Sequence, residues 1–193
     1  MKKLINFSIA VALSLFIISC SNGDTLEKQQ TKQIEAEVDD VSKGQSGVKD
    51  PDAPPNALDI AIASPDHTTL VAAVVAGGLQ NALVNAGPLT VFAPTNEAFG
   101  KLPEGTVESL VKPENKATLV HILEGHVSPG NYKIEWMKDG MQMYMANGEY
   151  YTVEIIDGEY FVGGAKILGS VPVSNGIVHV VDAVILPPPP PAE

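Results

Sequence analysis

Residues 90–99 read TVFAPTNEAF, and this stretch predicts a buried strand that leads directly into a helix. The apolar run Leu89–Ala93 is short and rich in β-forming residues, as expected of a strand inside a core. Pro94 ends the strand, and the side chains of Thr95 and Asn96 can accept hydrogen bonds from the first free amides of a helix. The core residues expected from this stretch are Val91, Phe92 and Phe99.

A second stretch, residues 175–187, reads NGIVHVVDAVILP and predicts a long buried strand over Ile177–Leu186. Gly176 allows the positive φ that an Asn-Gly turn needs. His179 and Asp182 are polar residues within this strand, so each requires a hydrogen-bond partner. Because they lie an odd number of positions apart, they face opposite sides of a regular strand and cannot pair with each other there.

The chain before and after the first stretch has helical spacing. Asn56 is a plausible N-cap for a helix that starts at Ala57, and Asp66 is a plausible cap for a helix over Leu70–Ala76. Further helices are expected near residues 79–84, 95–99, 106–111 and 113–123.

From Gly125 onward the apolar period changes to two, which is typical of strands. Alternating segments near residues 141–145 and 151–156 flank the pair Asn147-Gly148, a strong hairpin signal. Further short strands are expected at residues 160–162 and 165–168. Helices followed by antiparallel strands indicate the α+β class.

Two segments resemble the conserved boxes of fasciclin (FAS1) domains: residues 90–99 the first box and residues 175–187 the second. Residues 123–130, LEGHVSPG, resemble the histidine segment that lies between the boxes. The resemblance covers residues 57–187 and implies a FAS1-like fold, with a helical N-terminal half packed on an antiparallel β-wedge or sandwich. The family-motif residues that it marks, expected to be structural, are Thr90, Val91, Phe92, Ala93, Pro94, Thr95, Asn96, Phe99, His126, Asn175, Gly176, His179 and Asp182.

The chain departs from the family pattern at sites that matter for adhesion. Gly125 stands where family members often have a tyrosine. An Asp-Ile pair proposed for integrin binding in animal members has no counterpart near Ser170-Val171-Pro172. The chain has no arginine and therefore no Arg-Gly-Asp sequence, so the integrin-type mechanism does not transfer.

The N-terminus has the pattern of a bacterial export signal. Lys2 and Lys3 precede an apolar run over Leu4–Ile18, which is short for a membrane span and is followed by Cys20, the one cysteine of the chain. This pattern resembles a lipoprotein signal over residues 1–19 with lipidation at Cys20. The alternative is an ordinary signal peptide in which the cysteine is incidental.

Polar tails flank the apolar block at residues 57–187. Residues 20–56 have too little apolar content to offset chain entropy, which predicts a disordered tether after the lipidated cysteine. Within it, Asp24-Thr25-Leu26 weakly resembles an O-glycosylation site, and a solvated tether is the alternative. A run of prolines begins at Pro187, and residues 188–193 are expected to form a short proline-rich tail.

The charge of the chain limits its partners. The formal net charge is −11, and removal of Lys2 and Lys3 with the signal would leave −13. Nucleic-acid binding needs clustered cations, and docking to anionic lipid heads needs them too, so neither is expected. We expect an exported protein, anchored to the envelope by lipid at the outer membrane or cell surface.

Three functions are compatible with the sequence. The resemblance implies an adhesion or binding module with an unknown protein or glycan ligand, and no cofactor or metal. An enzyme is less favoured, because the chain lacks Gly-x-Ser-x-Gly, His-Glu-x-x-His and phosphate-loop motifs. His126 and His179 are expected to be structural, and His67 to be exposed in a turn. A passive envelope component or small-ligand carrier is the third possibility, which a discrete apolar pocket would favour, whereas a flat polar face would favour adhesion.

Overall fold

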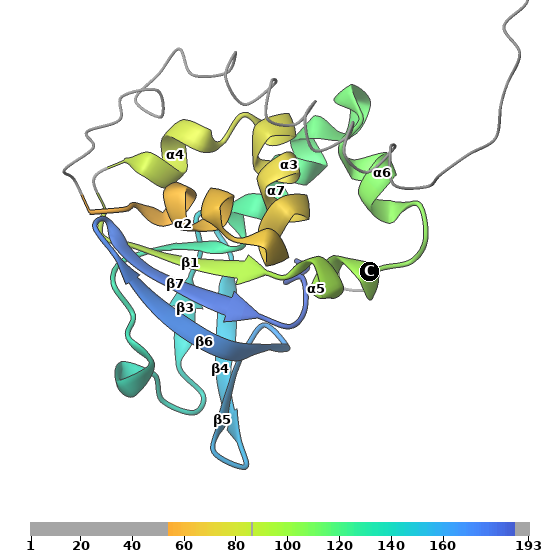
Figure 1. The fold of residues 1–193 in the computed structure, drawn as a ribbon. Coiled ribbons are helices and arrows are strands. Elements are labelled where there is room, and N and C mark those ends of the chain that lie inside the picture. The colour runs from red at the N-terminus through yellow and green to blue at the C-terminus, as the bar shows by residue number, and fades with distance from the viewer. Residues whose placement is uncertain (1–53, 86, 188–193) are drawn as a thin grey trace, which may run out of the picture.

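Helices occupy most of the first half of the described chain and strands most of the second half (Figure 1). The computed structural model describes residues 54–85 and 87–187, so Cys20, Thr25, the expected signal, nearly all of the tether and the tail at 188–193 lie outside the described residues. The α-helices are α2 (Ala57–Ala63), α3 (Thr68–Gly77), α4 (Gln80–Val84), α5 (Asn96–Gly100), α6 (Thr106–Leu110) and α7 (Lys116–Glu124). Short 3-10 turns are η2 (Pro65–His67), η3 (Pro113–Asn115) and η4 (Ile134–Trp136).

Seven strands form one mixed sheet in the order β2-β1-β7-β6-β5-β4-β3. They are β1 (Leu89–Pro94), β2 (Val127–Pro129), β3 (Gln142–Tyr144), β4 (Tyr150–Ile156), β5 (Glu159–Val162), β6 (Ala165–Val173) and β7 (Gly176–Val181). The expectation of a purely antiparallel arrangement is wrong, because β1 and β7 pair in parallel, with Thr90 opposite Ile177 and Pro94 opposite Val181. The two conserved boxes thus lie side by side at the centre of the molecule.

The two ends of the sheet approach each other and nearly close it. The Ala146 N–H donates to the Val127 carbonyl over 2.8 Å. The Ser128 hydroxyl donates to the Tyr144 carbonyl over 2.7 Å. These contacts join the end of β3 and the residues just after it to β2, the strand at the far end of the order.

Side chains on the central strands point alternately to the two faces of the sheet, and each face is covered by its own hydrophobic core. Val91 and Val178 face the layer of α2, α3, α4 and α7 that lies over β1 and β7 in Figure 1. Phe92 and Val181 face the opposite way, into a second core with the methionines and the β4–β5 hairpin. Both Val91 and Phe92 are buried, as predicted, and Phe99 packs against the helical core.

The predicted N-cap of α2 is confirmed. Asn56 Oδ1 accepts from the Leu58 and Asp59 amides at 2.9 and 3.1 Å, and Asp59 Oδ2 accepts from the Asn56 N–H at 3.1 Å. This reciprocal capping box satisfies amides at the helix start that have no partner within the helix.

The predicted cap of the next helix is wrong. Asp66 lies within the 3-10 turn η2 and makes no cap to α3, which begins at Thr68. The Asn96 side chain takes that place, because its Oδ1 accepts from the Thr69 N–H over 3.0 Å. A residue 27 positions away in the chain thus supplies the cap, which local sequence reading cannot find.

The last strand is shorter than predicted. β7 ends at Val181, whereas the apolar pattern continues to Leu186. Beyond Val181 the Asp182 N–H still donates to the Lys166 carbonyl over 3.1 Å, after which the chain leaves the ladder. Ile185 then returns to full burial in the second core. The apolar character of this segment therefore reflects burial and not strand pairing.

Among the described residues, no single helix has the length and hydropathy to span a bilayer. The pair Ala57–Ala63 and Pro65–Gly77 passes that test together, with a bend of 102° between its two parts.

Candidate functional site

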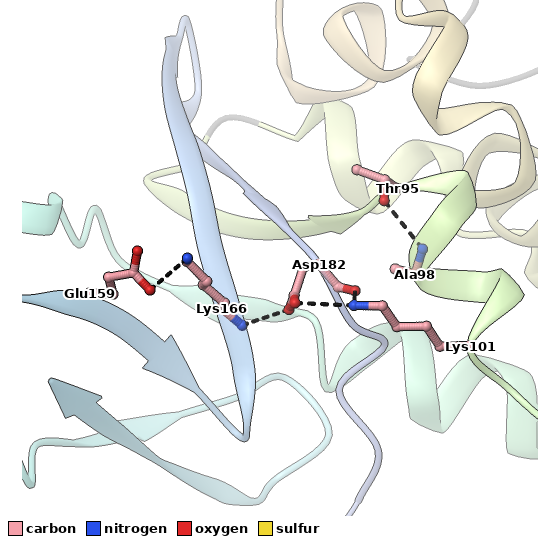
Figure 2. Close-up of polar contacts among 6 residues, drawn as sticks. All are labelled: Thr95, Ala98, Lys101, Glu159, Lys166 and Asp182. Atoms are coloured by element: carbon pink, nitrogen blue, oxygen red, sulfur yellow. Dashed lines mark hydrogen bonds and ion pairs between the residues drawn. The ribbon is translucent and has the colours of Figure 1, made fainter. Parts of the chain in front are cut away.

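The first box joins distant segments to the central strand. Thr90 is fully buried, its hydroxyl donates to the Gly130 carbonyl over 2.9 Å, and it accepts from the Tyr132 N–H over 2.9 Å. Thr95 caps α5 as predicted, accepting from the Ala98 N–H over 3.2 Å (Figure 2). The expectation that Asn96 helps cap the same helix is not met, because its side chain bonds α3 and donates to the Pro65 carbonyl. The box therefore organises the fold and presents little reactive chemistry.

The second box begins with a hub at Asn175. Its buried Oδ1 accepts from the Ala57 N–H over 3.1 Å, and its Nδ2 donates to the carbonyls of Leu83 and Asn85 over 2.7 and 3.1 Å. One amide group thus fixes the start of α2 and the end of α4 to the start of β7. Sequence reading marked this asparagine for its turn and missed these contacts.

Gly176 is required by close packing as well as by its φ of 151°. A Cβ at this position would lie 1.8 Å from the Leu89 carbonyl oxygen on the adjacent strand. The backbone of β7 can therefore approach β1 only with glycine here.

His126 is a structural residue of the interior. Its Nδ1–H donates to the Ile122 carbonyl over 2.8 Å, and its Nε2 accepts from the Ile185 N–H over 3.0 Å. These two partners select the neutral ring. In the charged ring Nε2 would also carry a proton, and that proton would point at the Ile185 N–H, which is itself a donor. Burial lowers the pKa of His126 from 6.5 to about 4, although the bond to Ile122 favours the charged form.

His179 lies on β7, stacks on Phe92 with ring centroids 5.4 Å apart, and bonds two neighbouring segments. Its Nε2 contacts the Tyr132 carbonyl at 2.8 Å, so this nitrogen carries the proton and Nδ1 accepts from the Ser170 hydroxyl at 2.7 Å. Burial is the main cause of its lowered pKa.

The Ser170–His179 contact was not foreseen from the sequence. It has the distance of a nucleophile–base pair, but the partner that orients the ring is a backbone carbonyl and not a carboxylate. Burial also lowers the pKa of this histidine, which weakens it as a base. The arrangement serves better to hold β6, β7 and the segment at Tyr132 together.

Asp182 forms a polar cluster at the end of β7 (Figure 2). Its Oδ1 accepts from the Lys166 N–H over 2.9 Å, and its Oδ2 pairs with Lys101 Nζ over 3.1 Å. Lys166 Nζ in turn pairs with Glu159. Partial burial raises the pKa of the Asp182 carboxyl, but the Lys166 amide and the Lys101 charge outweigh it and the net pKa is lowered. Asp182 and His179 have different partners, and Asp182 lies just beyond the end of β7, so the expectation that they face opposite sides of one strand does not apply to it.

The histidines do not converge on one centre. His121 contacts Glu149 Oε1 at 3.4 Å on the surface, while His126 and His179 have the separate buried partners described above. Within residues 54–85 and 87–187, no group of three or more His, Cys, Asp or Glu side chains is placed to hold a metal ion.

The expectation that His67 is exposed in a turn is wrong, since only 7% of it is accessible. Its Nδ1 contacts the Ser64 hydroxyl at 2.7 Å. Its Nε2 has no hydrogen-bond partner, a condition that it shares among the buried side chains of the described chain only with Gln80 Nε2.

His67 lines a cavity of about 240 Å³ between the helical layer and the sheet, referred to below as the helix–sheet cavity. Its wall is overwhelmingly apolar. Lining residues that come from helices include Leu58, Ile60, Ala61, Leu70, Val71, Val74, Leu83 and Leu123, and those from strands include Val91, Ala93, Val127, Val171, Val178 and Val180. A discrete apolar pocket of this kind favours ligand carriage among the functions considered from the sequence.

A different surface carries exposed aromatic residues. Tyr144 on β3 and Tyr150 on β4 are directly opposite in the ladder, with ring centroids 5.2 Å apart and exposed fractions of 44% and 62%. Beside them the Gln142 Nε2 donates to the Thr152 hydroxyl over 2.8 Å. These four residues are the hairpin face.

The comparisons with known proteins agree with this architecture. The family model of the fasciclin domain matches residues 65–187. The protein sll1483 of Synechocystis is 48% identical over 132 residues, which cover 68% of this chain and 73% of that protein. The cell surface glycolipoprotein MPB83 of Mycobacterium bovis is 30% identical over 108 residues, or 54% of this chain and 46% of that protein.

A solved structure supports the same fold. The FAS1 domain pair of the insect cell adhesion molecule Fasciclin I superposes with a TM-score of 0.53 at 19% identity, covering 69% of this chain and 51% of that one. The segment matched by the family model, residues 65–187, contains both boxes, the central histidine and the described helices and strands that follow α2. The chain belongs to the fasciclin domain family.

Proposed function

We propose that this protein is an extracytoplasmic binding module of the fasciclin type, held at the envelope by lipid on Cys20 and acting through the hairpin face. The observation that carries the proposal is the exposed Tyr144–Tyr150 pair on the solvent side of the β3–β4 hairpin. Tyrosines supply large, rigid, amphipathic contact area at small entropic cost, and they are enriched where proteins bind.

The composition of the hairpin face suggests what it contacts. The tyrosine rings lie beside the neutral hydrogen-bonding groups of Gln142 and Thr152. Such a mixture suits a neutral, hydroxyl-rich surface such as a glycan. A net charge of −11 and the absence of arginine oppose binding to polyanions.

Support for the location comes from relatives. One is named a cell surface glycolipoprotein, and the superposed structure belongs to a cell adhesion molecule. A lipid on Cys20 would give this chain the same kind of placement, and residues 21–53 would separate the domain from the membrane. A single acyl chain binds a membrane only marginally, so a stable anchor on Cys20 requires more than one chain or a second membrane-binding signal.

The experiment presents purified residues 20–193, with Cys20→Ser, to immobilised dextran, heparin and polylysine at low and physiological salt. We expect binding to dextran that is insensitive to salt and is weakened about tenfold or more by Tyr144→Ser with Tyr150→Ser, since aromatic anchors contribute about 2 kcal/mol or more. Val111→Ser, an exposed apolar residue after α6, is the matched control and should change nothing. Strong binding to heparin, or equal binding by the tyrosine variant, would refute the proposal.

A second candidate, a carrier of a small ligand, is favoured by the helix–sheet cavity. The cavity lies between the helical layer and the sheet, whereas the hairpin face is on β3 and β4. The two roles therefore use different parts of the domain and do not compete for residues.

A further inference from the structure

The hairpin face is one end of a longer outward-facing surface of the sheet. On β4, Tyr151 and Val153 point into the second core. Because successive side chains of a strand point to opposite faces, Tyr150, Thr152 and Glu154 share the outer face. Tyr150 and Glu154 are exposed, and Thr152 is partly exposed. The outer side of β4 therefore continues past the hairpin face as far as Glu154.

The strand beside β4 adds an aromatic ring to this surface. Phe161 on β5 lies directly opposite Glu154, and directly opposite residues of paired strands lie on the same face. Its neighbours Tyr160 and Val162 pack in the second core, which leaves Phe161 on the outer side, where it is partly exposed. In Figure 1 the β4–β5 hairpin extends away from the layer of helices. The hairpin face together with Glu154 and Phe161 is called the outer strip below.

The outer strip consists of three cross-strand rows that follow β4. The first row is the tyrosine pair, the second is Gln142 with Thr152, and the third is Glu154 with Phe161. Successive rows are two residues apart along β4, so the strip extends about 13 Å along the strand. This is longer than one sugar ring, and a chain of several sugars is needed to fill it.

The side chains of the strip suit a glycan better than a peptide. Aromatic rings at its two ends offer flat apolar area, which matches the C–H faces of sugar rings. Between them the amide of Gln142, the hydroxyl of Thr152 and the carboxylate of Glu154 can bond to sugar hydroxyls. An extended peptide binds best to the free edge of a sheet. At this strip the backbone of β4 is paired on both sides, with β3 and β5.

The charge of the strip selects a neutral chain. Glu154 makes no hydrogen bond or ion pair with another described residue. The cation beside the strip, Lys166 opposite Phe161, is already paired with Glu159. A free carboxylate accepts strong hydrogen bonds from hydroxyls and repels anionic groups.

We propose that the outer strip binds several consecutive sugars of a neutral, linear glycan chain, with Phe161 as a second aromatic platform and Glu154 as the residue that disfavours anionic glycans. The inference rests on the proposed function. It adds the length of the bound chain and the residue that selects its charge.

The first test measures chain length by NMR titration of glucose, isomaltose and isomaltotetraose, which share the main linkage of dextran, into residues 20–193 carrying Cys20→Ser. We expect isomaltotetraose to bind about tenfold or more tightly than glucose, because it reaches both aromatic ends. Phe161→Thr keeps a β-forming residue in β5. It should weaken isomaltotetraose about fivefold or more and leave glucose nearly unchanged.

The second test measures charge selection at low salt with dextran and carboxymethyl dextran, an anionic form of the same polymer. We expect the unchanged protein to prefer dextran. Glu154→Gln should reduce that preference about fivefold, the effect of one like-charge contact in water. Glu108→Gln on α6 changes the net charge equally at an exposed site and should keep the preference. Thermal unfolding checks that each variant is folded.

The outcomes separate this inference from the proposed function. Equal binding of glucose and isomaltotetraose by the unchanged protein, with dextran binding that still depends on Tyr144 and Tyr150, would overturn the extended strip and leave the proposed function standing. This length comparison decides the question if Phe161→Thr does not fold. Equal preference for dextran in Glu154→Gln and the unchanged protein would overturn the selecting role of Glu154. Absence of binding to the three sugars and to dextran would refute both the inference and the proposed function.

Discussion

His126 should make the domain sensitive to acid by an amount that the structure sets. Its pKa falls from 6.5 to about 4 on folding, mainly because burial opposes the charged ring. Above about pH 6.5 neither state is protonated at this residue and stability is unaffected. Below that pH the unfolded chain takes up a proton while the folded one does not until about pH 4, so stability falls as the pH falls.

The expected loss follows from proton linkage. The difference between 6.5 and about 4 corresponds to about 3 kcal/mol at roughly 1.4 kcal/mol per pKa unit. About 1 kcal/mol of this is lost by pH 5.5 and about 2–3 kcal/mol by pH 4.5. His179, whose pKa is lowered by burial as well, adds to the loss in the same direction.

The assay is urea unfolding at several pH values between about 7.5 and 4.5 for three proteins. His126→Gln keeps an acceptor for the Ile185 N–H but cannot titrate. We expect it to be about 1–3 kcal/mol less stable at neutral pH, because the bond to Ile122 is lost. Its further loss down to pH 4.5 should be about 2–3 kcal/mol smaller than that of the unchanged protein.

His121→Gln is the matched control, because His121 lies at the surface beside Glu149. It should retain the acid sensitivity that His126→Gln loses. If His126→Gln and the unchanged protein lose the same free energy between pH 7.5 and 4.5, the reasoning from burial and tautomer is refuted.

Further predictions test the anchor, the hub, the polar cluster and the domain boundary. Cys20→Ala should move the protein from the detergent-soluble membrane fraction to the soluble one, and unchanged fractionation would disprove the lipid anchor. Asn175→Ala should cost about 3 kcal/mol in urea unfolding, because it leaves the Ala57 amide and two carbonyls without partners, whereas the exposed Asn131→Ala should cost little. Lys101→Met should lower the free energy of unfolding by less than about 1 kcal/mol, because an exposed ion pair contributes little. Asp182→Asn should lower it more, because the Lys166 amide loses a charged acceptor. Equal losses in the two variants would contradict this order. Limited proteolysis should leave one resistant core over residues 57–187, and a resistant fragment that includes Glu27–Val41 would contradict the boundary.

Local signals in the sequence predicted much of the fold. The N-cap at Asn56, the strand at Leu89–Ala93 and the Asn147-Gly148 turn depend on neighbouring residues and are confirmed. His126 and His179 are buried and bonded to backbone groups, in accord with their expected structural role.

Features that depend on contacts between residues far apart in the chain could not be predicted from the sequence. The parallel pairing of β1 with β7 joins the two boxes across most of the domain. Asn96 caps a helix that precedes it, and Asn175 bonds two helices through one amide group. His67 follows a proline and an aspartate in a polar-looking turn, and it is buried because that turn packs against α2, α3 and α5.

The proposed role is tested most directly by adherence of cells that express the protein to a dextran-coated surface at physiological salt. Three forms are compared: the unchanged chain, Cys20→Ala, and Tyr144→Ser with Tyr150→Ser. The account predicts that both altered forms lose adherence, the first because the protein leaves the cells and the second although the protein remains on them. Full adherence by cells that carry the tyrosine variant would contradict binding through the hairpin face.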